Sequence, residues 1–204
     1  VRSARHDFIL LAAGLDSIFV HWGGSHFALD RLREKVVDNL DAIKNPYNTF
    51  YRDPNAPPAP HNGFTSAQRI LNASEKIGYG AENEFEGYSF YSDEEIKNQR
   101  KEFNEKQLCA QSAHGCSVTI GYPSLFRIIY EYDYEKNYYR RQRGSAPEID
   151  KNTKTQVRAS NVVVMIATSR QIEGQYNDVE LEGEGAAIVF QNGRRLEGKW
   201  KKDK

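Results

Sequence analysis

The alternation of hydrophobic and polar positions changes its period partway along the chain. Up to about residue 90, apolar residues recur at helical spacing around a short apolar strand at residues 18–20. From Cys116 onward, apolar and polar residues alternate, which is typical of half-buried strands. The pattern predicts an α+β protein, with an N-terminal α/β layer over residues 1–116 and an antiparallel β-rich domain over residues 117–204.

The first apolar strand runs into two glycines, and the next residue is a serine at an N-cap position before a helical pattern. Free backbone amides at such a turn attract anions, and a histidine at the end of the strand adds a titratable side chain. In the alternative interpretation, the glycines only allow close packing between a strand and a helix. The anion-binding candidates in this segment are His21, Gly23, Gly24 and Ser25.

Residues 1–14 predict a helix that begins near Ser3 and ends at Gly14. On this helix Arg2 and Arg5 share one face at the positive end of the helix dipole, where cations are disfavoured. Either a carboxylate from elsewhere in the fold or a bound phosphate can offset this charge, and both alternatives stay open.

Polar segments follow the second helix. Residues 37–41 predict the cap of a short helical turn, and the Pro-rich residues 45–63 predict a long irregular loop. A helix is expected to start at Thr65 or Ser66, and residues 92–106 predict a solvated helix or a polar linker. The polar residues of these segments complete the candidate binding set with Asp38, Arg52, Asp53, His61 and Asn62.

The C-terminal half predicts consecutive antiparallel strands. Its most apolar run, residues 161–167, predicts a central strand, and an Asn-Gly pair predicts the turn of the last hairpin. The expected strands cover residues 117–120, 126–133, 137–142 and 161–167, followed by a hairpin of residues 181–190 and 196–200 around Asn192-Gly193.

The composition of the chain limits the classes of partner that it favours. Lys plus Arg and Asp plus Glu each number 28 among 204 residues, so no net charge favours nucleic acid or an anionic membrane surface. No apolar run approaches the roughly 20 residues that span a bilayer. Cys109 and Cys116 flank a short loop and favour a disulfide in an oxidising compartment, with two free thiols as the alternative. His114 could add a zinc ligand, but no fourth ligand is nearby, so we predict no metal and no cofactor.

Several phrases, in the same order along most of the chain, resemble the YerB-like lipoproteins, an uncharacterised family of the bacterial envelope. The resemblance implies an extracytoplasmic location, a lipid anchor upstream of Val1, and a chain that lacks the start of the family's first domain. It implies no activity. The phrases cover residues 1–5, 21–25, 37–41, 51–53, 60–62, 130–133, 159–164 and 197–202.

A shorter stretch is similar to part of the LytR-CpsA-Psr phosphotransferases, which attach glycopolymers to the cell wall. The similarity covers the strand, the Gly-Gly turn, the helix and Asp38-Asn39-Leu40. Those enzymes bind a polyprenyl pyrophosphate through arginines and use acidic residues for magnesium. The resemblance implies a pyrophosphate role for Arg2 and Arg5 and is an analogy at the level of the fold.

Three functional hypotheses follow. The first is an envelope protein that binds an anionic, phosphate-containing small molecule or cell-envelope polymer. The second is a scaffold with a protein partner, in which the polar residues form a buried network. The third is a phosphotransferase or hydrolase with His21 or His61 as the base. No nucleophile motif, Walker loop or paired metal signature is present in the sequence, which places the enzyme third.

Overall fold

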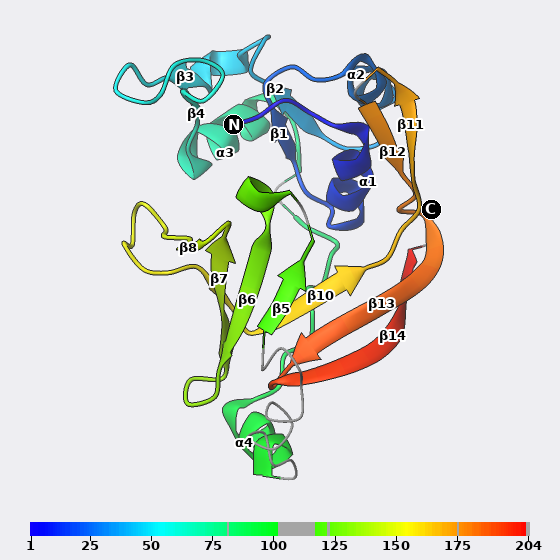
Figure 1. The fold of residues 1–204 in the computed structure, drawn as a ribbon. Coiled ribbons are helices and arrows are strands. Elements are labelled where there is room, and N and C mark those ends of the chain that lie inside the picture. Colours follow the sequence, from blue (N-terminus) through cyan, green and yellow to red (C-terminus); the bar gives the residue numbers. More distant parts are fainter. Residues whose placement is uncertain (81, 102–116, 122, 175, 203–204) are drawn as a thin grey trace. The chain divides into compact units, whose positions relative to one another are not determined.

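The chain forms two compact units (Figure 1). The first comprises Val1–Tyr88 and Thr168–Leu181, and the second comprises Ser89–Ala167 and Glu182–Lys204. The computed structural model describes residues 1–80, 82–101, 117–121, 123–174 and 176–202. The predicted Cys109–Cys116 disulfide and His114 therefore lie outside the described residues. The domain boundary predicted at residue 116 can still be compared with the two units.

The two units differ from that boundary in two places. Residues 89–101 belong to the second unit, and the hairpin of β11 and β12 (Ser169–Glu173 and Tyr176–Val179) belongs to the first. The hairpin joins the first unit because the Val179 amide donates to the Asp7 carboxylate at 3.0 Å. The contact links positions far apart in sequence, which a change of hydrophobic period cannot reveal.

The first unit combines helices with short strand pairs. Strands β1 and β2 are parallel and are connected through α2, whereas β3 pairs with β4 and β11 with β12 in antiparallel hairpins. Its other elements are α1 His6–Gly14, β1 Phe19–His21, α2 His26–Arg33, β2 Asn39–Asp41, η1 Pro46–Asn48, β3 Tyr51–Arg52, β4 Gly63–Phe64 and α3 Ala67–Ile77.

Helix α2 forms as its sequence predicts. The Ser25 hydroxyl accepts from the Ala28 amide at 3.3 Å, which satisfies one of the open donors at the helix start. Ala28 and Leu32 lie one turn apart and pack with Ile9 of α1 in a buried apolar cluster. Ser66 caps α3 in the same way through the Arg69 amide.

The N-terminal helix is shorter than predicted. It begins at His6, with Arg5 as its N-cap, so Arg2 and Arg5 do not share a helical face. The preceding residues are extended: the Ala4 amide donates to the Gly23 carbonyl at 2.8 Å, and the Ala4 carbonyl accepts from the Ser25 amide. Pairing with the glycine turn supplies backbone hydrogen bonds that a first helical turn would leave unmade.

The prediction of a helical cap at residues 37–41 is wrong. Residues 39–41 form β2, in which Leu40 lies opposite Val20 of β1 and is fully buried. Burial of Leu40 and parallel pairing with β1 outweigh the turn propensity of the flanking Asp and Asn residues.

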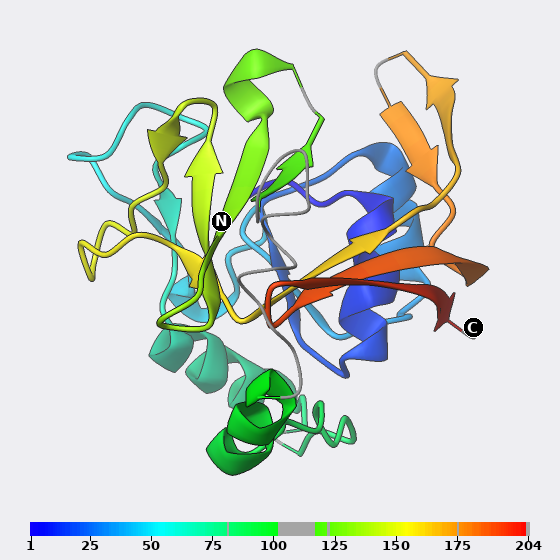
Figure 2. The ribbon, with the colours of Figure 1, turned by 60° about the horizontal axis from the view of Figure 1, so that its bottom comes forward.

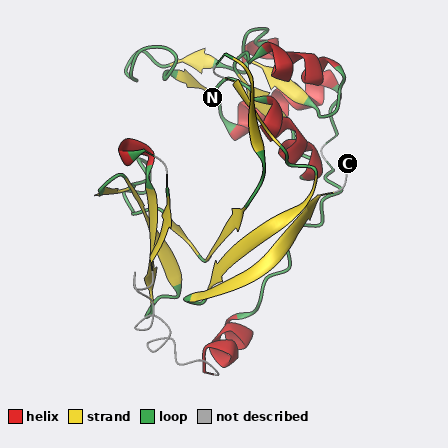
Figure 3. Ribbon diagram, turned by 45° about the vertical axis from the view of Figure 1, so that its right-hand side comes forward, coloured by secondary structure: helices red, strands yellow, loops and turns green. Residues whose placement is uncertain are grey.

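The second unit confirms the expected antiparallel β-rich region. Its described strands form one sheet in the order β5-β6-β7-β8, with β9 also paired to β7, and another in the order β10-β13-β14. Figure 2 and Figure 3 show β13 and β14 as one long hairpin. The elements are α4 Asp93–Lys101, β5 Ser117–Ile120, η2 Ser124–Phe126, β6 Ile128–Asp133, β7 Tyr138–Arg143, β8 Ala146–Pro147, β9 Arg158–Ala159, β10 Asn161–Met165, β13 Gly183–Gln191 and β14 Arg194–Lys202.

Tyrosines form much of the core of this unit. Tyr132 and Tyr139 pack with Val162 of β10. Among the described strands β10 pairs only with β13, so it lies at a sheet edge and is not the central strand predicted. Val162 faces the tyrosines, whereas Val163, on the other face of the strand, is exposed. The turn between β13 and β14 has positive φ at Asn192 and Gly193 and confirms the predicted hairpin.

Among the described residues, no helix has both the length and the apolar character required to cross a membrane.

Candidate functional site

The β3–β4 hairpin positions several of the predicted binding residues. Tyr51 lies opposite Phe64 and Arg52 opposite Gly63. The loop that joins the strands closes with a hydrogen bond from the Asp53 amide to the Asn62 carbonyl at 3.0 Å. Because successive strand residues point to opposite faces, Tyr51 and Arg52 lie on different faces of the hairpin.

The Trp22 indole covers the Arg52 face of the hairpin. A Cβ atom on Gly63 would lie 2.5 Å from Trp22 Cε3, so only glycine permits this close approach. The Arg52 guanidinium carbon lies 4.1 Å from the centre of the Trp22 ring, within the range of a cation–π contact. The Trp22 amide donates to the Arg2 carbonyl at 2.9 Å, which places the N-terminal segment beside the indole.

Neutral side chains hold both arginines at this position. Arg52 Nη1 donates to Asn62 Oδ1 at 2.6 Å, and Arg2 Nη1 lies 2.6 Å from His61 Nδ1. Since a guanidinium only donates, His61 accepts through Nδ1 and is neutral, with its proton on Nε2. Among the described residues, neither arginine forms an ion pair with a carboxylate. We call Arg2, Trp22, Arg52, His61 and Asn62 the arginine cluster.

Asp53 does not join the arginine cluster through its side chain. Its carboxylate accepts from the Asn55 amide at 2.9 Å and so caps the loop that follows β3. The acidic residue adjacent in sequence to Arg52 therefore serves the turn, and no contact of its carboxylate with either arginine is seen.

His21 lies in a separate, buried network. Its side chain is almost fully buried; Nδ1 is 2.9 Å from the Gly23 carbonyl and Nε2 is 3.3 Å from Asn39 Oδ1. The Asp41 carboxylate lies 3.8 Å from Nδ1 and accepts from the Gly23 amide at 3.0 Å. These contacts have the form of a polar network that satisfies its own members.

The glycine turn uses its amides within the protein. The Gly23 amide donates to Asp41, and the Ser25 amide donates to the Ala4 carbonyl at 3.2 Å. A Cβ atom on Gly24 would lie 2.9 Å from the Ala4 side chain, so Gly24 allows the N-terminal segment to pack closely. These contacts favour the close-packing interpretation of the turn.

Arg5 lies apart from Arg2. Its Nη1 donates to the Ala4 carbonyl at 3.0 Å, and its guanidinium carbon is 5.9 Å from the centre of the Tyr176 ring in β12. Arg2, Arg5 and His21 therefore contact three different sets of residues, whereas Arg2, Arg52, His61 and Asn62 come together.

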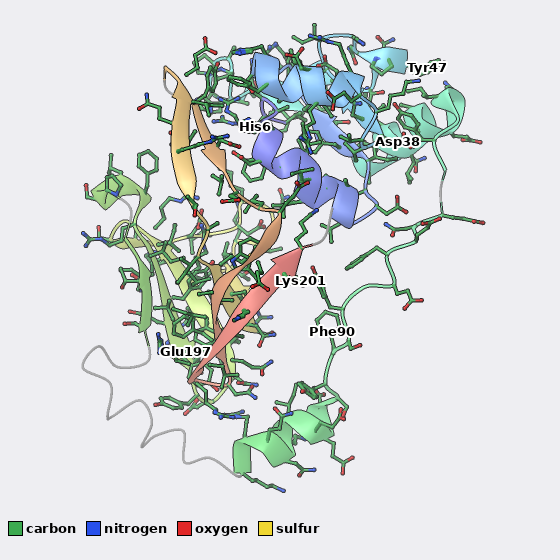
Figure 4. The ribbon with its side chains drawn as sticks, turned by 90° about the vertical axis from the view of Figure 1, so that its right-hand side faces the viewer. His6, Asp38, Tyr47, Phe90, Glu197 and Lys201 are labelled. Atoms are coloured by element: carbon green, nitrogen blue, oxygen red, sulfur yellow. The ribbon has the colours of Figure 1, made fainter. Side chains whose placement is uncertain are left out.

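A cleft of about 830 Å³ opens beside β2. His21 and Asp38 line it, together with basic residues from the end of α2 and the loop after β2, and Figure 4 labels Asp38 there. Its lining carries both signs of charge. The lining residues are His21, Leu29, Leu32, Arg33, Lys35, Val37, Asp38, Asn39, Asp41, Lys44, Pro46, Ile77 and Tyr79.

Two further features of the structure could not be predicted from the sequence. One is Trp22, whose partner Arg52 is distant in the chain. The other is a cluster of His6, Asp7 and Asp178 whose ligand atoms lie close enough together to hold a metal ion. Within it, His6 Nε2 is 3.3 Å from Asp178 Oδ1. Arg170 donates two hydrogen bonds to Asp178 Oδ2 and so holds the pKa of that carboxyl below its usual range, with the His6 contact adding to the effect.

Comparisons with known proteins agree with the resemblance stated above. The chain is 30% identical over 203 residues to "Putative lipoprotein YerB" of Bacillus subtilis (strain 168), which covers 98% of this chain and 57% of that protein. The crystal structure of YerB protein from Bacillus subtilis superposes with a TM-score of 0.78 at 27% identity, covering 98% of this chain and 63% of that chain. The chain thus spans less than two thirds of either relative.

Two family models match in sequence order. Residues 1–80 match the N-terminal domain of the family described as "Protein of unknown function (DUF3048)". Residues 118–204 match the C-terminal domain of the same family. These matches cover most of the chain and fall on its two halves. The chain belongs to the DUF3048 family and is a homologue of YerB.

Proposed function

We propose that the arginine cluster binds an anionic, phosphate-containing ligand, either a small molecule or a polymer of the cell envelope. One observation carries the proposal: His61 and Asn62 hold Arg2 and Arg52 in place without neutralising them. A guanidinium presents a planar fork of donors that matches the oxygens of a phosphate. Each arginine uses one nitrogen for its neutral acceptor, so further donors remain for a ligand.

The cluster is also ordered before a ligand arrives. Arg52 is fixed on one side by the Trp22 ring and on the other by Asn62. Immobilising a flexible side chain on binding costs about 0.5–1.5 kcal/mol, and this cost is smaller for a side chain that is already held. Arg52 and Arg2, the latter held by His61, together favour a ligand that offers more than one phosphate oxygen.

The other two hypotheses have narrower support. The buried network of His21, Asn39 and Asp41 supports the scaffold hypothesis for that part of the first unit. The phosphotransferase hypothesis is weaker, because His21 is buried in this network and the Nδ1 atom of His61 accepts from Arg2. Among the described residues, the contacts of His21 and His61 do not place a ring nitrogen beside an exposed nucleophile.

The name of the Bacillus subtilis relative supports an extracytoplasmic location for this chain, with membrane attachment through a lipid anchor. A phosphate-containing polymer of the envelope would be within reach there. Fractionation of cells that make the full-length protein tests this location, and recovery in the cytosol would contradict it.

Calorimetric titration with inorganic pyrophosphate tests the binding site. We expect the wild type to bind, and Arg2→Ala or Arg52→Ala to lower the affinity about ten- to a hundredfold, because a charge-assisted hydrogen bond contributes about 1.5–3 kcal/mol. Arg5→Ala is the matched control, because it removes the same charge from the same segment. The native Arg5 contacts Tyr176 and does not belong to the arginine cluster. An equal loss in the Arg5 variant, or no binding by a folded wild type, would refute the site.

A further inference from the structure

The other face of the β3–β4 hairpin carries a separate group of aromatic and basic side chains. The Tyr51 and Phe64 rings lie 6.2 Å apart, and the Arg69 guanidinium of α3 lies 5.1 Å from the centre of the Tyr51 ring. Two turns further along α3, Lys76 Nζ lies 5.2 Å from the centre of the Tyr47 ring. We call Tyr47, Tyr51, Phe64, Arg69 and Lys76 the aromatic face.

These side chains are open to solvent. Tyr47 is 58% exposed, Tyr51 44% and Phe64 38%. Figure 4 labels Tyr47 at the edge of the first unit. None of the five residues lines the cleft beside β2. Exposed rings grouped in this way are typical of a surface that contacts a partner.

The charge of the aromatic face is positive. Arg69 and Lys76 are seven residues apart on α3 and therefore lie on one flank of the helix, whereas the acidic residue Glu75 lies about 120° away from Arg69 around it. Among the described residues, neither Arg69 nor Lys76 forms an ion pair; Arg69 Nη1 instead donates to the Asn48 carbonyl at 2.6 Å. The zero net charge of the whole chain thus conceals a local excess of cations.

We propose that the aromatic face binds an anionic lipid surface. Tyrosine rings settle at the headgroup level of a bilayer because one end of the ring is apolar and the other polar. Lysine and arginine beside them attract anionic headgroups. Each cation of the aromatic face lies over a tyrosine ring, so a surface that accepts the rings also meets the charges.

A lipid surface fits this face better than a dissolved anion does. A dissolved phosphate gains nothing from exposed rings, and the arginine cluster on the opposite face of the hairpin already offers two better-ordered guanidiniums. The inference is independent of the proposed function, because Tyr51 and Arg52 point in opposite directions from β3.

Co-sedimentation with vesicles tests the proposal. The whole chain is mixed with vesicles of phosphatidylcholine alone and with vesicles that also contain phosphatidylglycerol. We expect binding only to the second kind, and weaker binding at high salt. Arg69→Gln and Lys76→Gln should each lower the partition coefficient about fivefold. Tyr47→Ser should also lower it.

Matched controls separate this surface from others. Lys97→Gln and Lys101→Gln remove the same charge from the exposed helix α4 and should leave vesicle binding unchanged. Arg2→Ala should also leave it unchanged. Melting curves of each variant show whether the chain still folds, and pyrophosphate titration does the same for every variant that keeps Arg2. No binding to phosphatidylglycerol vesicles, or an equal loss in the α4 variants, or loss with Arg2→Ala but not with Arg69→Gln, would overturn the proposal.

Discussion

Replacing Gly63 with alanine tests how closely the hairpin and the Trp22 ring fit together. The added methyl group would lie 2.5 Å from Trp22 Cε3 and 2.6 Å from Cζ3. Ring carbons cannot bend aside as the end of a lysine can, so the hairpin or the indole must shift. Such overpacking costs about 1–3 kcal/mol. Alanine also restricts the unfolded chain, which stabilises by about 0.4–1 kcal/mol.

Taken at the middle of both ranges, the net effect of Gly63→Ala is a loss of about 1.3 kcal/mol in the free energy of unfolding. For a unit of about a hundred residues, this lowers the melting temperature by about 5–10 °C. Gly80→Ala is the control, because no atom lies within 4 Å of its added Cβ. We expect that variant to melt at or slightly above the wild-type temperature.

Calorimetric melts of the whole chain, combined with pyrophosphate titration, provide the assay. A shift of the hairpin away from Trp22 also separates Arg52 from the ring, so affinity for pyrophosphate should fall together with stability. A Gly63→Ala variant that melts at or above the wild-type temperature and binds pyrophosphate unchanged would show that Trp22 and the hairpin are not in the contact described.

Two other measurements follow from the structure. Arg170→Gln should lower stability at neutral pH by at most about 1 kcal/mol. The pKa of Asp178 is lowered mainly by Arg170, so this difference should disappear as the pH falls below the usual range of an aspartate, about 4, and a difference that persists in acid would count against the ion pair. Gly193→Ala should destabilise the second unit in thermal melts, because its φ is +72° and its Cβ would meet a buried tyrosine ring at 2.6 Å; an unchanged melting curve would argue against that turn.

Local signals in the sequence predict the elements that local interactions determine. Ser25 and Ser66 cap helices because a hydroxyl side chain satisfies an amide three residues ahead. The turn at Asn192-Gly193 forms because both residues tolerate the left-handed conformation that a tight hairpin needs. In each case the sequence contains the donor, the acceptor or the backbone freedom within a few residues.

Elements that depend on distant partners could not be predicted in this way. The segment around Ala4 is extended because it pairs with Gly23 and Ser25, and Leu40 is in a strand because Val20 lies opposite. The run at Val163 is apolar enough for a central strand, yet only one face of that strand meets the tyrosines of the core. Composition counts the apolar residues of a strand but does not tell which face is covered.

The candidate site shows the same division. The residue types of Arg2, Arg52, His61 and Asn62 suggested anion binding, but their pairing depends on the N-terminal segment lying beside the hairpin. Trp22 gave no signal, because a tryptophan that follows a strand is ordinary until its partner is known. The close contact between Gly63 and the Trp22 ring exists only in the folded chain, so no local sequence signal indicates it.

The nature of the acceptor that holds each donor decides where an anion fits best. At the glycine turn, the Gly23 amide donates to the Asp41 carboxylate. An anion about 4 Å from that carboxylate would be repelled by about 4 kcal/mol at the screening typical of a protein surface, more than one backbone hydrogen bond returns. In the arginine cluster the acceptors are an imidazole and an amide rather than a carboxylate, so the groups that hold the arginines do not repel an approaching phosphate. The donors therefore favour a ligand at the arginine cluster and a closed internal network at the glycine turn, and the attraction at the cluster should weaken as added salt screens it.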